Sequence, residues 1–369
     1  MTETEARYPE LGPLYRWPFG LTDNPNVVIE PTTACNLNCA ACYRGSNDPS
    51  RRQLPMTLPE IYAYIDEALS LRQFHTLSFL GGEPLLYREL DQAVLYARKR
   101  GLAVGVYTNG ELLHKYRARE LQTAGVSYIY VHVDRHQGRT PTTAETTALW
   151  NHFCEMFRKL KDVNFGIGLI VHEADLPDLQ CHAEFFKANA DVIRFVNLSL
   201  LGPLPPEHAT TAQIVATSTA VDAFQRRACE VIRIAFGVEF CSYMGSKFRS
   251  EVPGKLMAAT AYGPGSRVAR MSAEQFGHLN ERYRSEFGRY PYLLGKESTD
   301  DFAKHSARVV DSPWQYLVIS LSPLLLPEHR WNVCHFCTDC VLYDHRFVPM
   351  CQLDPFKAGD PLVDESVRY

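Results

Sequence analysis

The chain has 369 residues, of which 46% are hydrophobic and 22% are charged, as in an ordinary globular protein with a sizeable core. This composition argues against a disordered chain. Its 38 basic and 42 acidic residues give a formal net charge of −4, so the sequence argues against a polyanion-binding surface and a nucleic-acid partner.

The sequence also carries no targeting or membrane signal. Its first residues, MTETEARYPELG, are acidic and polar, unlike the basic start and apolar core of a signal peptide. The most apolar later segment, residues 316–327, contains two prolines and is shorter than the roughly 20 residues that span a membrane. We therefore expect a cytoplasmic protein without a membrane span.

In chain order, residues 1–25 are predicted to form an N-terminal segment, and residues 26–202 alternate between apolar strand patterns and helical patterns. Strands are predicted at 27–29, 76–80, 103–107, 128–133, 165–171 and 192–198. Helices are predicted at 58–71, 86–100, 112–124, 143–161 and 176–189. Such alternation is typical of right-handed βαβ units around a parallel sheet. It predicts an α/β fold, a partial (β/α)6 TIM-like barrel with its chemistry at the C-terminal ends of the strands.

A proline-rich stretch, GPLPPEHATT, interrupts this alternation after Leu201. Residues 203–330 are predicted to form a connecting α+β region with helices at 212–236 and 273–287. Residues 331–369 form a cysteine-rich C-terminal extension, which we expect to be a separate module.

The eleven cysteines are unevenly distributed, because three lie at positions 35, 39 and 42 and four at positions 334, 337, 340 and 351. In a chain of this size without an export signal, clustered cysteines indicate metal or cluster ligands before disulfides. The first group, C-x3-C-x2-C, follows the first predicted strand. Three thiolates on one loop leave one corner of a metal centre free, whereas a structural zinc site takes four ligands.

The segment CNLNCAACY resembles the cluster loop of the radical S-adenosylmethionine (radical SAM) superfamily. The resemblance covers roughly the first 200 residues, since FLGGEP and VYTNG follow the second and third predicted strands as in that family. It implies a 4Fe-4S cluster on Cys35, Cys39 and Cys42 that binds S-adenosylmethionine. It also implies cofactor contacts from Gly81, Gly82, Glu83, Pro84, Thr108 and Asn109, with Glu83 as an acceptor for the methionine ammonium.

Further positions follow from the same resemblance. Asp134 and His136, after the fourth strand, are expected to face the substrate as catalytic residues, and Asn197 is expected to contact the ribose. Many members carry an aromatic residue before the third cysteine. This chain has Ala41 there, so Tyr43 is expected to supply the packing against the cofactor.

The C-terminal cysteines follow C-x2-C-x2-C with Cys351 ten residues later. Cys334, Cys337, Cys340 and Cys351 are expected to hold either a second, auxiliary 4Fe-4S cluster of the twitch or SPASM kind, or zinc. Cys340 is the ligand left in question, because three thiolates would leave a further iron open.

The resemblance implies an enzyme that reductively cleaves S-adenosylmethionine to a 5′-deoxyadenosyl radical, which abstracts hydrogen from a substrate. A small-molecule substrate is expected, because only about 25 residues precede the first strand, against the roughly 50 of a small recognition domain. The auxiliary cluster is then an electron acceptor or a substrate anchor, in dehydrogenation, dehydration, epimerisation or C–C bond formation. An electron donor such as flavodoxin or ferredoxin is the expected partner. The alternatives are a peptide or protein maturase, or a barrel protein with structural zinc.

Overall fold

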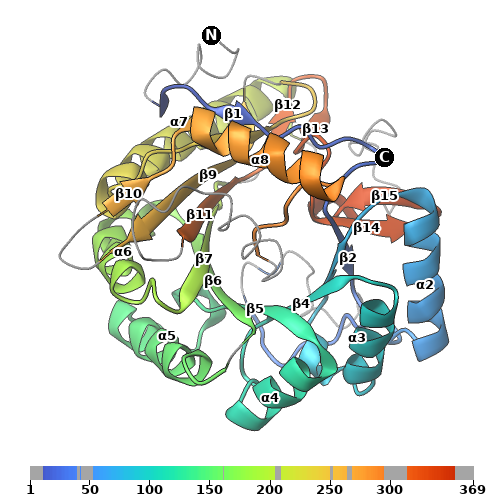
Figure 1. Cartoon of the computed structure of the whole chain (residues 1–369). Helices are drawn as coiled ribbons and strands as arrows, with labels where there is room; N and C mark the ends of the chain where they lie inside the picture. The colour runs from blue at the N-terminus through green and yellow to red at the C-terminus, as the bar shows by residue number, and fades with distance from the viewer. Residues whose placement is uncertain are drawn as a thin grey trace.

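The computed structural model describes residues 11–39, 42, 53–160, 162–203, 209–249, 252–263, 268–294 and 314–353. Its centre is one curved sheet whose strands follow the order β1-β8-β9-β11-β7-β6-β5-β4-β3-β2-β14-β15, with β10 on β9. Figure 1 looks along the axis of this sheet, which curls around a central space with helices on its outer side.

Six parallel strands form the middle of the sheet: β2 (Asn26–Ile29), β3 (Thr76–Phe79), β4 (Ala103–Thr108), β5 (Val126–His132), β6 (Asn164–Val171) and β7 (Ile193–Leu200). The helices that follow them are α2 (Leu58–Leu71), α3 (Leu90–Lys99), α4 (Lys115–Ala124), α5 (Thr143–Phe157), α6 (Leu179–Ala188) and α7 (Thr211–Phe236). The predicted fold, a partial TIM-like α/β barrel, is confirmed.

Local sequence explains why these units form. The first helix, α2, begins after Thr57, which makes a capping box with Glu60, and its buried residues Ile61, Ile65 and Ala68 recur at helical spacing. The strand β3 is buried at every position, as a strand covered on both faces requires. The barrel core therefore lies between the sheet and the outer ring of helices.

Four of the predicted helices differ by three residues or more at one end. The helix predicted over 86–100 runs from Leu90 to Lys99, after a separate 3-10 turn at Pro84–Leu86. The helix predicted from residue 112 begins at Lys115, because the ring of His114 caps it by accepting a hydrogen bond from the Arg117 N–H. The segment predicted as one helix over 176–189 contains Pro177. It divides into a 3-10 turn, Glu173–Asp178, and α6. The helix predicted over 143–161 ends at Phe157.

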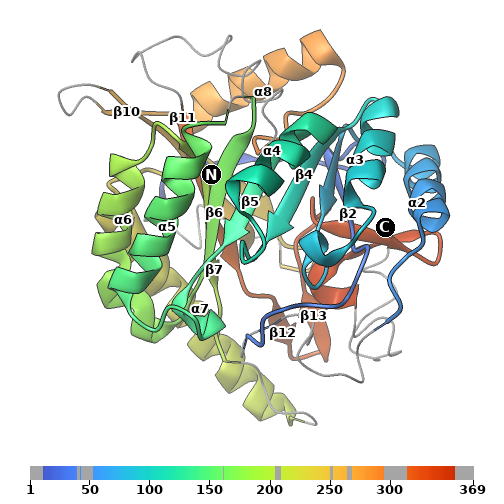
Figure 2. The same ribbon diagram turned by 90° about the horizontal axis from the view of Figure 1, so that it is seen from below.

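The connecting region extends the same sheet beyond β7. Strand β11 (Trp314–Leu321) pairs parallel to β7, and β9 (Pro253–Tyr262) pairs antiparallel to β11. Next come β8 (Ser242–Gly245) and β1 (Tyr15–Arg16), and β10 (Val268–Arg270) pairs with the C-terminal end of β9 on the same edge as β8. The helix α8 (Ala273–Phe287) lies across one end of the barrel in Figure 2.

The C-terminal tail completes the opposite edge of the sheet. Strand β14 (Cys340–Tyr343) pairs parallel to β2, and β15 (Arg346–Pro349) pairs antiparallel to β14. Between β11 and β14 the chain forms the small hairpin β12 (Leu324–Leu326) and β13 (Arg330–Asn332). The tail therefore joins the barrel sheet, while the segment boundaries given above remain predictions.

Among the helices in the described ranges, none is long and apolar enough to cross a membrane.

Candidate active site

A cavity of about 400 Å³ lies at the C-terminal ends of the parallel strands, between the loops that follow them and the C-terminal tail. Its lining includes thirteen of the predicted site residues: Cys35, Cys39, Cys42, Gly81, Gly82, Thr108, Asn109, Asp134, His136, Asn197, Cys334, Cys337 and Cys351. Glu83, Pro84 and Cys340 are not part of this lining, and Tyr43 lies outside the described residues.

The three cysteines after β2 face this cavity from one loop. The thiol of Cys35 accepts a hydrogen bond from the Leu37 N–H (3.4 Å), and the Cys42 N–H donates to the Cys39 carbonyl (3.3 Å). Burial, together with Cys35 and Cys42, raises the pKa of the Cys39 thiol to about 11. Three neighbouring thiols on one cavity wall are a donor set that suits an iron–sulfur cluster.

The glycines of FLGGEP bring the loop after β3 against the cysteine loop. The N–H of Gly82 donates to the Thr32 carbonyl (3.0 Å), and the N–H of Glu83 donates to the Ala34 carbonyl (2.8 Å). A Cβ atom on Gly82 would lie 2.2 Å from the Ala34 carbonyl oxygen. The two loops thus form one unit, and the close approach that needs these glycines is between backbone segments.

Glu83 is buried, and its side chain is hydrogen-bonded to the loop that follows β4. Its carboxylate accepts hydrogen bonds from the Asn109 N–H (2.8 Å), the Thr108 hydroxyl (2.7 Å) and the Leu85 N–H (3.0 Å). Burial nevertheless raises the pKa of Glu83. Pro84, also buried, begins the short 3-10 turn that follows. With no exposed surface, Glu83 is placed behind the cavity wall, so the structure gives no support for its predicted contact with an ammonium.

Asn109 links its own loop, which follows β4, to the cysteine loop. Its side-chain amide donates to the Asn36 side chain (2.8 Å) and, at 3.7 Å, to the Cys35 thiol. Its side-chain oxygen accepts from the Glu111 N–H (2.9 Å). Asn109 therefore connects the ends of β2 and β4, and its side chain contacts one of the predicted cluster ligands directly.

Asp134 makes several hydrogen bonds at the end of β5. Its carboxylate accepts from His132 Nε2 (2.7 Å), from the Ile170 N–H (2.9 Å) and from the His136 N–H (2.9 Å). Burial opposes its ionisation, but these partners outweigh burial and lower the pKa of Asp134. Asp134 is thus an acceptor that orients His132.

His136 and His132 both reach the cavity lining. The ring of His136 is paired with Asp175 through Nε2 (2.8 Å) and packs edge-on against His172. His132 was not singled out from the sequence, although it is the last residue of β5 and lies only two positions before Asp134. Of the two histidines, His132 is the more exposed (37% against 24% of the side chain).

Asn197 lies deeper in the barrel, and its side chain is already occupied. It donates to the Tyr130 hydroxyl (3.3 Å) and to Ser199 Oγ (3.1 Å), and it accepts from Ser320 Oγ (2.9 Å). These partners come from β5, β7 and β11. The predicted ribose contact of Asn197 stays a prediction, and its observed contacts join three strands.

The C-terminal cysteines approach the same cavity from the tail. Cys334, Cys337 and Cys351 line it. Cys340 is not in the lining, and its thiol donates to the Cys337 carbonyl (3.0 Å) within the hydrophobic core, to which Cys337 also belongs. Hydrogen bonds from the thiols of Cys334 and Cys340 lower the pKa of Cys337. The cavity therefore has predicted cluster ligands on two of its walls. Among the described residues, no three Cys, His, Asp or Glu side chains converge as they would around a single metal ion.

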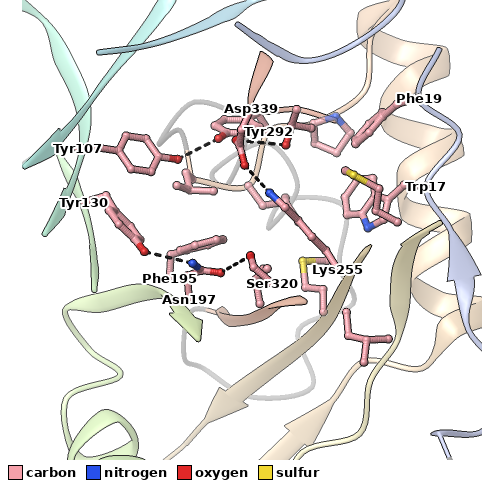
Figure 3. A pocket seen from close by; sticks show the side chains of 18 residues that line it. Trp17, Phe19, Tyr107, Tyr130, Phe195, Asn197, Lys255, Tyr292, Ser320 and Asp339 are labelled. Carbon is pink, nitrogen blue, oxygen red and sulfur yellow. Dashed lines mark hydrogen bonds and ion pairs between the residues drawn. The ribbon is translucent and has the colours of Figure 1, made fainter. Parts of the chain in front are cut away.

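A second, smaller cavity of about 120 Å³ lies deeper in the barrel; we call it the inner chamber (Figure 3). It shares six lining residues with the large cavity: Tyr107, Tyr130, Asn197, Lys255, Ser320 and Asp339. Lys255, on β9, forms an ion pair with Asp339 of the tail. Burial opposes the charge on Lys255, but Asp339 with Cys337 and Cys334 outweighs it and raises the pKa of the lysine.

Fold and site together define a class. A partial α/β barrel with three cysteines on the loop after its first parallel strand, facing a cavity at the strand ends, is the arrangement of an iron–sulfur barrel protein. Residues 29–173 match the family model of the Radical SAM superfamily. Residues 29–173 are therefore a radical SAM domain, the kind of enzyme domain that uses a 4Fe-4S cluster and S-adenosylmethionine.

Two curated relatives come from Methanosarcina barkeri. Fe-coproporphyrin III synthase is 33% identical over 116 residues, which cover 31% of this chain and 29% of the relative. AdoMet-dependent heme synthase is 34% identical over 123 residues, which cover 33% of this chain and 35% of the relative. The chain thus matches about a third of the length of these relatives.

Solved structures are similar at a lower level. The structure described as native anSMEcpe with bound AdoMet is 18% identical with a TM-score of 0.41, covering 63% of this chain and 73% of that chain. Streptococcus suis SuiB bound to precursor peptide SuiA is 15% identical with a TM-score of 0.40, covering 61% of this chain and 50% of that chain.

Proposed function

We propose that this chain is a radical SAM enzyme that acts on a small organic substrate within the 400 Å³ cavity. The observation that carries the proposal is that Cys35, Cys39 and Cys42 line the same cavity as Gly81, Gly82 and Asn109. When bound there, the cluster and S-adenosylmethionine supply a 5′-deoxyadenosyl radical, which removes hydrogen from an unactivated carbon.

The protein's part is to hold and enclose the reactants. Cys35, Cys39 and Cys42 are the proposed ligands of the cluster. Asn109 and the glycine loop fix the shape of the cysteine loop through the contacts described above. Enclosing the reactants in a cavity limits their contact with bulk water, so that a reactive species meets the intended C–H bond.

We further propose that Cys334, Cys337 and Cys351 hold an auxiliary 4Fe-4S cluster, with Cys340 in a structural role. Support comes from the shared cavity, which those three thiols line, and from the hydrogen bond of the Cys340 thiol to a backbone carbonyl in the core. Three thiolates leave one iron for a substrate group or for electron transfer. An external reductant such as flavodoxin or ferredoxin would feed the first cluster.

At the substrate side, we propose that His132 exchanges a proton with the substrate or binds one of its hydroxyl groups, while Asp134 positions its ring. The hydrogen bond from His132 Nε2 to the buried Asp134 carboxylate supports this division of roles.

The test is anaerobic reconstitution with iron and sulfide, followed by incubation with S-adenosylmethionine and dithionite. The wild-type protein is expected to hold about eight iron atoms per chain and to form 5′-deoxyadenosine. Cys39→Ala should abolish 5′-deoxyadenosine, while Cys334→Ala, Cys337→Ala and Cys351→Ala should each remove about four irons. Cys340→Ala is the matched control and should keep about eight. Cleavage by Cys39→Ala would refute the enzymatic proposal, and stoichiometric zinc in the tail would refute the auxiliary cluster.

A further inference from the structure

The inner chamber continues the large cavity along the neighbouring strands β7, β11 and β9. Alternate residues of each strand face the same side of the sheet. We call the residues that line both cavities the junction. On β7 the inward residues are Phe195 in the chamber, Asn197 at the junction and Ser199 in the large cavity. On β9 the order is Met257, Lys255 and Pro253. The lining thus changes from apolar in the chamber to polar and charged at the junction.

The junction is held by register as well as by side chains. Lys255 of β9 lies opposite Ser320 of β11, which in turn lies opposite Ser199 of β7. Figure 3 shows Lys255 reaching toward Asp339 on one side, and the chain of Tyr130, Asn197 and Ser320 on the other. A molecule entering the chamber from the large cavity passes this polar layer.

The ion pair of Lys255 and Asp339 can make further hydrogen bonds to a ligand. Their side chains are 21% and 30% exposed, and both line the two cavities. The ammonium has three donors, of which Asp339 takes one. Among the described residues, Asp339 accepts through one oxygen from Lys255 and through the other a long hydrogen bond from Thr338 (3.4 Å). Each partner therefore has room for one more charged group.

Charge balance decides which ligand fits. A lone anion or cation at an enclosed neutral pair would leave one uncompensated charge in a cavity walled by protein, which is costly. A ligand that carries both a carboxylate and an ammonium adds no net charge. The carboxylate meets Lys255 and the ammonium meets Asp339.

The size and lining of the inner chamber indicate which side chain the ligand carries. Its volume of about 120 Å³ is close to that of the roughly 150 Å³ apolar cavity that binds benzene. Trp17, Phe19 and Phe195 supply ring surfaces there. We propose that the junction and the inner chamber bind an α-amino acid zwitterion, with a single-ring or branched apolar side chain in the chamber. This inference rests on the proposed function only in calling that amino acid the substrate.

L-Phenylalanine is the probe, and titration calorimetry on the iron-loaded full chain without S-adenosylmethionine is the measurement. Two matched analogues share its ring: 3-phenylpropanoate lacks the ammonium and 2-phenylethylamine lacks the carboxylate. L-Phenylalanine is expected to bind, with each analogue about 10- to 100-fold weaker, as for the loss of one charged hydrogen bond. Equal affinity for either analogue, or no binding of L-phenylalanine at millimolar concentration, would overturn the proposal.

Variants locate the site. Lys255→Met and Asp339→Asn should each weaken L-phenylalanine binding about 10- to 100-fold. Val318→Phe fills the chamber without touching the charged pair and should also abolish binding. Lys187→Met is the control, since Lys187 lies on α6 and donates to the Ala235 carbonyl away from both cavities. A thermal unfolding curve like that of the wild type shows that each variant is folded, and unchanged affinity in folded Lys255→Met would overturn the site.

The two proposals fail separately. If the wild type binds L-phenylalanine but forms no 5′-deoxyadenosine, the amino-acid site is supported and the proposed radical chemistry is refuted. If 5′-deoxyadenosine forms but L-phenylalanine does not bind, only the amino-acid site falls.

Discussion

At the residue scale, the end of β5 shows one carboxylate with several partners. Asp134 accepts from the ring of His132 and from two backbone N–H groups, and it is nearly inaccessible (3% exposed). Hydrogen bonds to an ionised acceptor are stronger than neutral ones. The sequence predicted that Asp134 and His136 face the substrate together. In the structure, however, the ring that is hydrogen-bonded to the Asp134 carboxylate is that of His132.

Asp134→Asn is expected to lower the free energy of unfolding by about 1–3 kcal/mol at pH 7, because buried donors lose an anionic acceptor. Folding lowers the pKa of Asp134, so its contribution is fully present above the unfolded value near 4 and is lost as the pH falls through the folded value. Urea denaturation at pH 7 measures the difference. The same substitution should lower the yield of any product found in treated cell extract, relative to 5′-deoxyadenosine.

Asp178→Asn is the matched control, since Asp178 is partly exposed (34%) and pairs with Arg135. Its loss should cost less than about 1 kcal/mol. Equal destabilisation by the two substitutions would show that Asp134 is not a special acceptor.

At the element scale, the site depends on contacts between loops that follow different strands. The loop after β3 donates two backbone hydrogen bonds to the loop after β2, and Asn109 after β4 adds a side-chain contact. Parallel neighbours place their C-terminal ends at one edge of a sheet, so these loops meet without any contact in sequence.

Gly82→Ala tests this contact. The new Cβ would lie 2.2 Å from the Ala34 carbonyl oxygen and 2.5 Å from that of Thr33, so the loops must separate. We expect a loss of about 1–3 kcal/mol in stability, as for overpacking, and at least about tenfold slower formation of 5′-deoxyadenosine. Iron analysis after reconstitution should show fewer irons in the first cluster.

Gly20→Ala serves as the control, because a Cβ on Gly20 meets nothing within 4 Å. It should retain full iron content and activity. If Gly82→Ala retained both as well, the two loops would not need to be in contact for cluster binding.

At the scale of the whole molecule, the tail is part of the barrel sheet. The Tyr64 hydroxyl, from α2, donates to the Val28 carbonyl of β2 (2.5 Å) and accepts from the Leu342 N–H of β14 (2.6 Å). Strand β14 pairs with β2 at Val341 and Val28. This hydroxyl thus joins the first barrel strand to the tail that carries the second set of cysteines.

Tyr64→Phe removes that bridge and leaves two backbone groups without their partner. The expected cost is about 1–3 kcal/mol in the free energy of unfolding. Hydrogen exchange should speed up at the Leu342 amide, because β14 opens more often. Tyr62→Phe, on the same helix and stacked on Tyr96, should change neither quantity. Equal exchange at Leu342 in both variants would contradict the bridging role.

The sequence alone determined the barrel strands, their order and the cysteine loop. Buried parallel strands are continuous apolar runs, and a cluster loop is a short local motif, so both are visible in a few consecutive residues. The same reasoning found FLGGEP and Asn109 at the ends of their strands. It did not show that Gly81 and Gly82 also lie against the backbone of the cysteine loop, where a Cβ atom would clash.

Only the tertiary structure decided which side chains from distant parts of the chain lie together. Cys340 is three residues from Cys337, yet it does not line the cavity, because β14 begins there and pairs with β2. Lys255 carries no local signal at all, and it meets Asp339, 84 residues away, because β9 and the tail belong to one curved sheet. Register and sheet curvature, which no short stretch of sequence specifies, bring these two charges together at the entrance to the inner chamber.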